Sequence, residues 1–163
     1  MLSKIFILTT TLLILGGVNF SIYQKEQLLQ NGTPLLLELV PADPRSLMQG
    51  DYMALRYQIA EEVKPQLKRL DIRRGHLVVA IDKNQVAQFK AIYDGKMELR
   101  PTEYLLYFRA RQDEIYLGAE SFFFQEGHAD HYETAHYGEL RVSPSGESIL
   151  VGLRDEKFKS LGP

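Results

Sequence analysis

Residues 5–23 read IFILTTTLLILGGVNFSIY, and this stretch decides how the chain is organised. It contains no charged residue and is made of apolar and weakly polar side chains. As a helix rising about 1.5 Å per residue it spans roughly 28 Å, close to the thickness of a bilayer's hydrocarbon core. Phe20 and Tyr23 lie at its far end, where aromatic rings favour the membrane interface. The sequence therefore predicts one transmembrane helix, with residues 1–32 as the anchor and a short extension.

The charges that flank this stretch favour one orientation of the chain. Lys4 and the amino terminus precede the span, and cations beside a span favour the cytoplasmic side. Lys25, at the other end, opposes this bias. We expect the N-terminus to be cytoplasmic and the rest of the chain to lie across the membrane.

Removal of the stretch as a signal peptide is the alternative. Cleavage requires small residues three and one positions before the cut. The best pairs, Gly17 with Asn19 and Asn19 with Ser21, fit this rule poorly. Residues 26–30 continue the helical pattern, and Asn31-Gly32 is a typical C-terminal cap. An uncleaved anchor is therefore favoured.

Composition excludes several classes of function. The chain has 163 residues, which suits one domain plus an anchor. Its 19 basic and 21 acidic residues give a net charge of −2, and Lys and Arg form no run. Nucleic acid, which requires clustered cations, is not an expected partner. The absence of cysteine excludes disulfides, thiol catalysis and cysteine zinc sites.

Beyond Thr33 the pattern changes to the alternation of β-strands. We expect a compact, mainly β domain over residues 33–156, followed by a C-terminal tail over residues 157–163. The expected strands are 35–40, 51–60, 77–81, 86–93, 104–111, 115–124, 138–143 and 148–153. Short turns join the last six into three hairpins, which favours antiparallel pairing in a sandwich or partly closed barrel. Residues 61–70, interrupted by Pro65, are expected as a linker or short helical turn, and residues 126–136 as a short helix.

The stretch 50–57 reads GDYMALRY: Gly-Asp-Tyr, two free positions, Leu, one free position and Tyr. It resembles the motif that names the GDYXXLXY family of bacterial membrane-anchored proteins. Other segments are also similar to that family, so the resemblance covers most of residues 33–153: Asp43-Pro44-Arg45, residues 122–127 (FFFQEG), Tyr132-Glu133 and Gly138-Glu139-Leu140. The resemblance implies a single-pass protein of the bacterial inner membrane with a periplasmic domain. It also implies association with a polytopic membrane protein, and it implies no catalytic activity or cofactor.

The motif has two physical interpretations. In a strand, Leu55 and Tyr57 share the core face, whereas Tyr52 points to the opposite face. Gly50 allows a tight entry into that strand, and Asp51 accepts hydrogen bonds from loop N–H groups. The motif either locks a loop onto a strand or forms a polar recognition patch. The candidate binding residues are Asp43, Arg45, Gly50, Asp51, Tyr52, Tyr57, Glu126, Tyr132 and Glu133.

The anchor and the entry into the strand at Gly50 resemble those of type I signal peptidases, which combine an N-terminal anchor with a Pro-x-x-x-x-Gly-Asp entry into a strand. Pro44 precedes Gly50 by one position too many, and Val40 and Pro41 occupy the places where the nucleophile should stand. No Lys follows Gly50 before residue 61 to act as a base. The chain is not expected to share this chemistry.

Two further arrangements of ionisable residues are possible. His128 and His131 would share a helix face, but His136 lies about 140° round from His131, so three ligands do not converge and no metal is expected. Glu120 falls on an apolar strand face, where we expect Arg45, Arg100 or Arg109 to satisfy it.

The sequence favours an accessory or binding domain held near the membrane over an enzyme. The alternative is an envelope enzyme, or a small-ligand or metal sensor. It would use a polar cleft between the Gly50 loop and residues 126–136.

Overall fold

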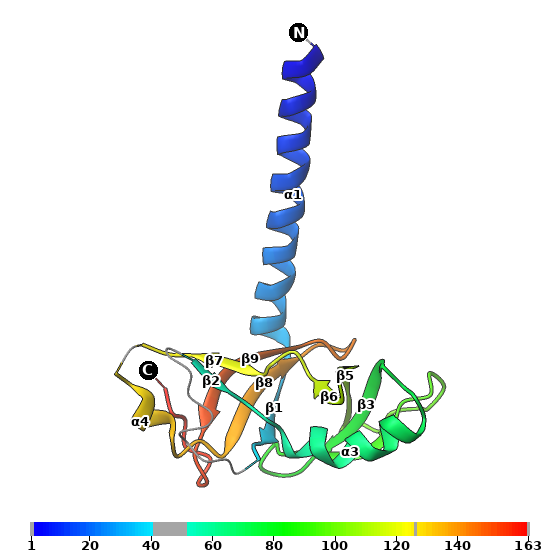
Figure 1. Ribbon diagram of the computed structural model, residues 1–163, viewed down its shortest axis with the longest axis vertical. Helices are drawn as coiled ribbons and strands as arrows, with labels where there is room; N and C mark the ends of the chain where they lie inside the picture. The colour runs from blue at the N-terminus through cyan, green and yellow to red at the C-terminus, as the bar shows by residue number, and fades with distance from the viewer. Residues whose placement is uncertain (1, 41–51, 126, 163) are drawn as a thin grey trace.

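The structure is a computed structural model, and it describes residues 2–40, 52–125 and 127–162. One long helix, α1 (Leu2–Asn31), stands away from the rest of the chain (Figure 1). Within the described residues, its segment Lys4–Asn31 is long and apolar enough to cross a membrane, with a mean hydropathy of 2.0 in its most apolar window. None of that window is buried against the protein. The long apolar helix that the sequence predicts is therefore present.

The helix ends where the sequence indicates. The N–H of Gly32 donates to the carbonyl oxygen of Leu28 over 2.9 Å, which closes the last turn. A Cβ atom at Gly32 would collide with that oxygen, and it would lie 3.0 Å from the Cβ of Arg141. Glycine is thus needed to bring α1 close to the part of the chain that follows, called the head domain below.

The described part of the head domain is mainly β, with nine strands and two helices. Its elements are β1 (Thr33–Glu38), β2 (Tyr52–Ala54), α3 (Gln58–Arg69), β3 (Arg74–Ile81), β4 (Ala87–Ile92), β5 (Glu103–Arg111), β6 (Glu114–Tyr116), β7 (Ser121–Phe123), α4 (Ala129–Tyr132), β8 (Tyr137–Val142) and β9 (Ser148–Arg154). They form three sheets with the orders β1-β8-β9, β2-β7 and β4-β3-β5-β6. Every pair of these strands is antiparallel, as expected, and the sheets curve into a half-barrel.

Backbone hydrogen bonds connect the two larger sheets. The N–H of Tyr107 in β5 donates to the carbonyl of Gly146 in the β8–β9 turn over 2.8 Å. The N–H of Leu36 in β1 donates to the carbonyl of Gln85, before β4, over the same distance. Leucines and valines of both sheets fill the space between them, among them Leu37, Leu77 and Leu140, which are fully buried.

Two of the expected strands are shorter than predicted. Within the strand expected over 51–60, only β2 is described as a strand, and the chain enters α3 at Gln58. Ile59, Val63 and Leu67 recur every four residues and are buried, as one face of an amphipathic helix requires. Pro65 lies inside this helix, so the linker or short helical turn expected over 61–70 is part of a helix of 12 residues.

The strand expected over 115–124 is divided into β6 and β7. Gly118 adopts a φ of +85° between them, a conformation that bends the chain out of a strand. The chain then returns to pair β7 with β2, not with β5.

The residues expected as a C-terminal tail fold back onto the domain. The N–H of Leu161 donates to the carbonyl of Leu153 over 2.8 Å, and Ser160 forms a bridge with Arg154. The head domain therefore extends from Thr33 to residue 162 where the structure describes it.

Candidate functional site

The candidate binding residues fall into two groups. Those that lie outside the described residues are Asp43, Arg45, Gly50, Asp51 and Glu126. Those that the structure describes are Tyr52, Tyr57, Tyr132 and Glu133. The described four lie around the short ribbon of β2 and β7.

Tyr57 is a core residue that joins several elements. Its side chain is 2 % exposed, and its hydroxyl donates to the carbonyl oxygen of Ala119, just before β7. Its backbone forms a bridge with Leu39, beyond the end of β1. Burial, and to a smaller extent the negative charge of Glu120, raise the pKa of Tyr57 far above its usual range.

The ring of Tyr57 occupies space that a glycine leaves open on β8. A Cβ atom at Gly138 would lie 3.0 Å from Cε1 and 3.1 Å from the hydroxyl oxygen of Tyr57. Both residues belong to segments that define the resemblance described above. Their contact gives a structural reason for two separate parts of that pattern, and it supports the interpretation of the motif as a lock.

Tyr52 lies on the outer side of the ribbon. It pairs with Phe123 across the two strands, and the ring centroids are 5.7 Å apart. Phe123 itself is the most exposed large hydrophobic residue of the described head domain. Phe123 is not among the candidate binding residues, because a run of three phenylalanines does not by itself reveal which ring is exposed.

Tyr132 lies on the inner side of the same ribbon. Its ring contacts Phe122, with centroids 4.9 Å apart, and Phe124, at 5.3 Å. It is 3 % exposed, so a ligand reaches it only through its neighbours. Glu133, the next residue, is exposed at the end of α4. Strand β7 thus brings Tyr52 and Tyr132 close together in the fold, but on opposite faces.

Glu120 accepts hydrogen bonds from backbone groups, and among the described residues neither Arg100 nor Arg109 forms an ion pair with it, whereas Arg45 lies outside the described residues. Its Oε1 accepts from the N–H of Gly118 over 2.9 Å and from the N–H of Leu117. These bonds hold the bend between β6 and β7. The described structure gives Arg100 a different acidic neighbour, Glu103, at 3.9 Å.

The histidines of the 126–136 segment have separate surroundings. His131 Nε2 lies 3.1 Å from the carbonyl oxygen of Gly162, and His136 Nε2 lies 3.6 Å from a carboxylate oxygen of Glu38. Within the ranges that the structure describes, no three His, Cys, Asp or Glu side chains are grouped as ligands of a metal ion. Glu126 lies outside these ranges.

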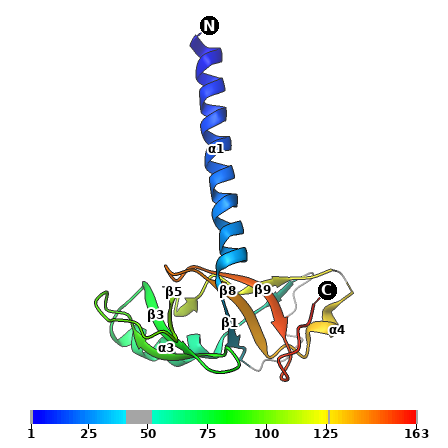
Figure 2. The ribbon, with the colours of Figure 1, turned by 180° about the vertical axis from the view of Figure 1, so that it is seen from behind.

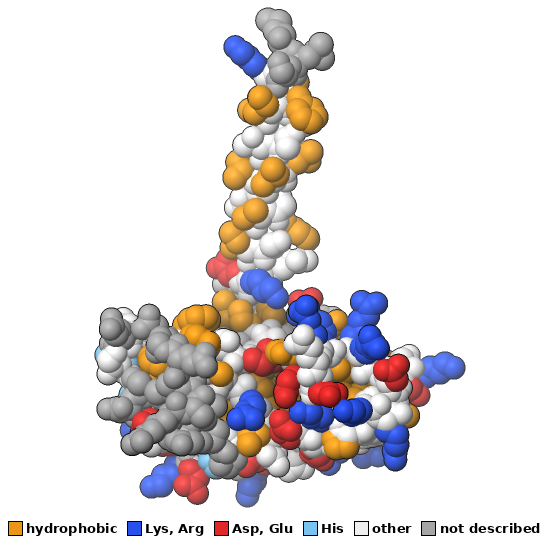
Figure 3. Space-filling view, viewed as in Figure 1, with side chains coloured by type: hydrophobic (Ala, Val, Ile, Leu, Met, Phe, Trp, Pro, Cys, Tyr) orange, Lys and Arg blue, Asp and Glu red, His pale blue; other side chains and the backbone are white. Residues whose placement is uncertain are grey.

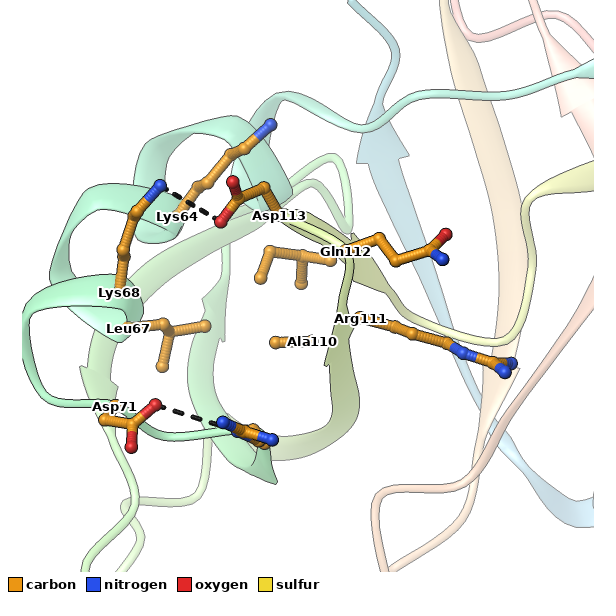
Figure 4. Close-up of a pocket in the computed structure, with 10 residues that line it drawn as sticks. Lys64, Leu67, Lys68, Asp71, Ala110, Arg111, Gln112 and Asp113 are labelled. Atoms are coloured by element: carbon orange, nitrogen blue, oxygen red, sulfur yellow. Dashed lines mark ion pairs between the residues drawn. The ribbon is translucent and has the colours of Figure 1, made fainter.

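A groove that the sequence did not predict lies between α3 and the β5–β6 turn (Figure 4). Its volume is about 680 Å³. Leu67, Ala110 and Ile115 form its apolar floor, and Lys68 faces Asp113 across it with an N–O distance of 3.0 Å. Its signal in the sequence was the four-residue spacing within 58–69, which the linker interpretation overlooked.

A second groove lies where α1 meets the head domain. Its volume is about 570 Å³. Tyr23, Gln27 and Leu28 line it from α1, and residues of the β8–β9 turn, including Pro144, line it from the other side. Neither this groove nor the one beside α3 is lined by Tyr52, Tyr132 or Glu133.

Charge is distributed unevenly along the molecule. Figure 3 shows mainly hydrophobic and uncharged side chains along α1, and charged side chains over the visible face of the head domain, including the region where α1 meets it. Lys25 of α1 and Glu147 of the β8–β9 turn form an ion pair there, with an N–O distance of 3.7 Å.

Comparison with known proteins gives one match. A family model described as "GDYXXLXY protein" matches residues 14–153, most of the chain. No curated protein and no solved structure matches this chain.

Proposed function

We propose, from the premise that this chain belongs to the GDYXXLXY protein family, that it is an accessory protein anchored in the bacterial inner membrane. In this proposal α1 spans the membrane, the head domain faces the periplasm, and the chain associates with a polytopic membrane protein. The observation that carries the proposal is the bare surface of α1, whose apolar window has no buried residue.

The spanning part of α1 carries polar and small residues that suit packing against another helix. Asn19 donates one amide hydrogen to the carbonyl of Leu15, over 2.8 Å. Gly16 and Gly17 have open space around them, because nothing beyond their chain neighbours and the backbone of the helix itself lies within 4 Å of a Cβ placed there. In lipid, helices associate through small residues that allow close approach and through polar side chains that bond across the interface.

One face of α1 leads from the membrane to the head domain. Thr9, Gly16 and Tyr23 are spaced by seven residues, so they lie on nearly the same side of the helix. Tyr23 also lines the groove between α1 and the β8–β9 turn. A partner helix that packs along this face would end in that groove.

Two polar groups near the family motif are already used to hold the fold together, so they are not available for catalysis, and this favours binding. Glu120 holds a bend, and the hydroxyl of Tyr57 is used inside the core. The alternative, an enzyme or a ligand or metal sensor with a cleft near Gly50 and residues 126–136, stays a prediction. It depends on residues outside the described ranges.

Purification of the full chain through a C-terminal tag from detergent-solubilised membranes tests the association. We expect a polytopic membrane protein, identified by mass spectrometry, to be recovered with the wild-type chain. Gly16→Ile should reduce that recovery about tenfold, which corresponds to about 1.4 kcal/mol of lost packing.

Thr11→Ile is the control, because it introduces the same side chain about 140° round the helix from Gly16. Recovery with this variant should stay near the wild-type level. Recovery of the chain alone, or equal losses in both variants, would contradict the proposed interface.

A further inference from the structure

We propose that the head domain rests directly on the lipid bilayer, with the ring of Phe123 inserted among the lipid headgroups. The proposal rests on the anchoring by α1 proposed above. It adds a second membrane contact, made by the β2–β7 ribbon, which neither the sequence pattern nor the family match assigns.

The first argument is the distance between the apolar span and the head domain. Helix α1 continues to Asn31 and β1 begins at Thr33, so only Gly32 separates them. If the span ends at Tyr23, the eight residues to Asn31 add about 12 Å of helix. The headgroup layer outside the hydrocarbon core is about 5–8 Å thick. The head domain therefore begins within a few ångströms of the headgroups.

The second argument is that the junction is held in one orientation. Arg141 of β8 donates to the carbonyl oxygen of Gly32 over 3.3 Å, and Lys25 pairs with Glu147. Leu28 is buried against the head domain. The β8–β9 turn lines a groove together with Phe20 and Tyr23, so part of the head domain is level with the end of the span. These contacts present one fixed side of the head domain to the membrane.

The third argument is the exposure of Phe123 on that side. Both ribbon views place the β2–β7 ribbon along the edge of the head domain from which α1 rises (Figures 1 and 2). Phe123 is 74 % exposed, against 72 % for Phe6 and 72 % for Leu13, two residues of the apolar span. An aromatic side chain as exposed as those of the anchor, carried by a strand on the anchor's side of the head domain, fits the same surroundings. With α1 anchored in the membrane, lipid is the apolar phase that lies next to this side of the head domain.

Side chains at the base of α1 also suit the headgroup layer. Tyr116, Arg109 and Lys25 line one small groove of about 230 Å³ at the base of α1. Aromatic residues are enriched at membrane interfaces, and cations near the surface attract anionic phosphate groups. A protein surface covering Phe123 is the competing possibility, and the experiment below distinguishes it.

The chain contains no tryptophan, so single tryptophan variants report on one position each. The full chain carrying Phe123→Trp is reconstituted as the only protein in bilayers whose acyl chains are brominated near their headgroup ends. Bromine quenches tryptophan fluorescence on contact. Leu13→Trp in the middle of α1, measured in bilayers whose acyl chains are instead brominated near their methyl ends at the bilayer centre, reports whether the helix is inserted.

Leu70→Trp is the control for the head domain. Leu70 is 51 % exposed at the end of α3, which lies on the side of the head domain away from α1 in both ribbon views. We expect strong quenching for Phe123→Trp and Leu13→Trp, and none for Leu70→Trp, each measured against the same lipid without bromine.

The outcomes separate this inference from the proposed function. Quenching of Leu13→Trp without quenching of Phe123→Trp would show an inserted anchor and a ribbon free of lipid, which overturns the inference alone. It would leave Phe123 available to a protein partner. Absence of quenching at both positions would remove the anchoring and the inference together.

Discussion

Replacing Leu13 and Ile14 with arginine is expected to abolish stable anchoring of the chain in the membrane. Both residues lie at the middle of the apolar stretch, and both side chains are exposed. Each arginine at the centre of a spanning helix opposes insertion by about 2.5–3.5 kcal/mol, so the pair opposes it by about 5–7 kcal/mol. Alkaline carbonate extraction of membranes, followed by detection of a C-terminal tag, measures the fraction that stays embedded.

The matched control exchanges the same residues conservatively, as Leu13→Ile with Ile14→Leu, and should stay in the membrane pellet. The wild-type chain tests the signal-peptide alternative in the same experiment. A wild-type chain that is extracted into the supernatant, and whose mass shows that residues before about 22 have been removed, would refute the anchor.

Truncation of Tyr57 to alanine is expected to have the largest effect on the stability of the head domain. The ring is 2 % exposed and fills the space above Gly138. Its hydroxyl satisfies the carbonyl of Ala119. Loss of a buried aromatic ring costs about 3–5 kcal/mol of the free energy of unfolding. Urea unfolding of the full chain in detergent micelles, followed by far-UV circular dichroism, measures this loss.

Tyr57→Phe separates the hydroxyl from the ring. It keeps the packing and removes one hydrogen bond, so we expect a loss of about 0.5–1.5 kcal/mol at neutral pH. Because the folded pKa of Tyr57 is raised, the unfolded chain releases the phenol proton first as the pH rises above about 10. The free energy of unfolding of the wild type should therefore fall there by up to about 1.4 kcal/mol per pH unit. This part of the alkaline loss should be absent in Tyr57→Phe, and an equal slope in both chains would contradict the assignment.

Much of the fold could be predicted because its hairpins depend on local chemistry. The Asp82 carboxylate accepts hydrogen bonds from the N–H groups of Asn84 and Val86, which closes the turn between β3 and β4 within five residues. Ser143 and Gly146 close the β8–β9 turn in a similar way. Residues close in sequence determine such features, so their composition reveals them.

Features that depend on distant residues could not be predicted in the same way. The pairing of β2 with β7 joins Tyr52 to Phe123, far apart in the chain. Alternating burial of Met53, Leu55 and Tyr57 was correct, but the pattern does not show that the chain turns into α3 at Gln58. The interruption by Pro65 concealed a helix whose stability comes from packing of its buried face.

The candidate binding residues stay a prediction. Tyr57 and Tyr132 were chosen as binding residues from the sequence, and the structure places both side chains in the core. A tyrosine carries a large apolar ring and a hydroxyl, so its sequence context alone does not distinguish a core position from a recognition surface. Phe123 is the opposite case, because it was not a candidate and yet its side chain is exposed. Its exposure depends on how β7 pairs with β2.

A measurement of the orientation of the chain across the membrane tests the proposed arrangement most directly. Because the chain has no cysteine, Lys157→Cys in the exposed C-terminal part gives one thiol for labelling by a membrane-impermeant maleimide. Lys4→Cys, before the span, is its counterpart. With the outer membrane permeabilised and the inner membrane intact, Lys157→Cys should be labelled and Lys4→Cys should not. Labelling of Lys157→Cys only after the inner membrane is opened would contradict the proposed arrangement.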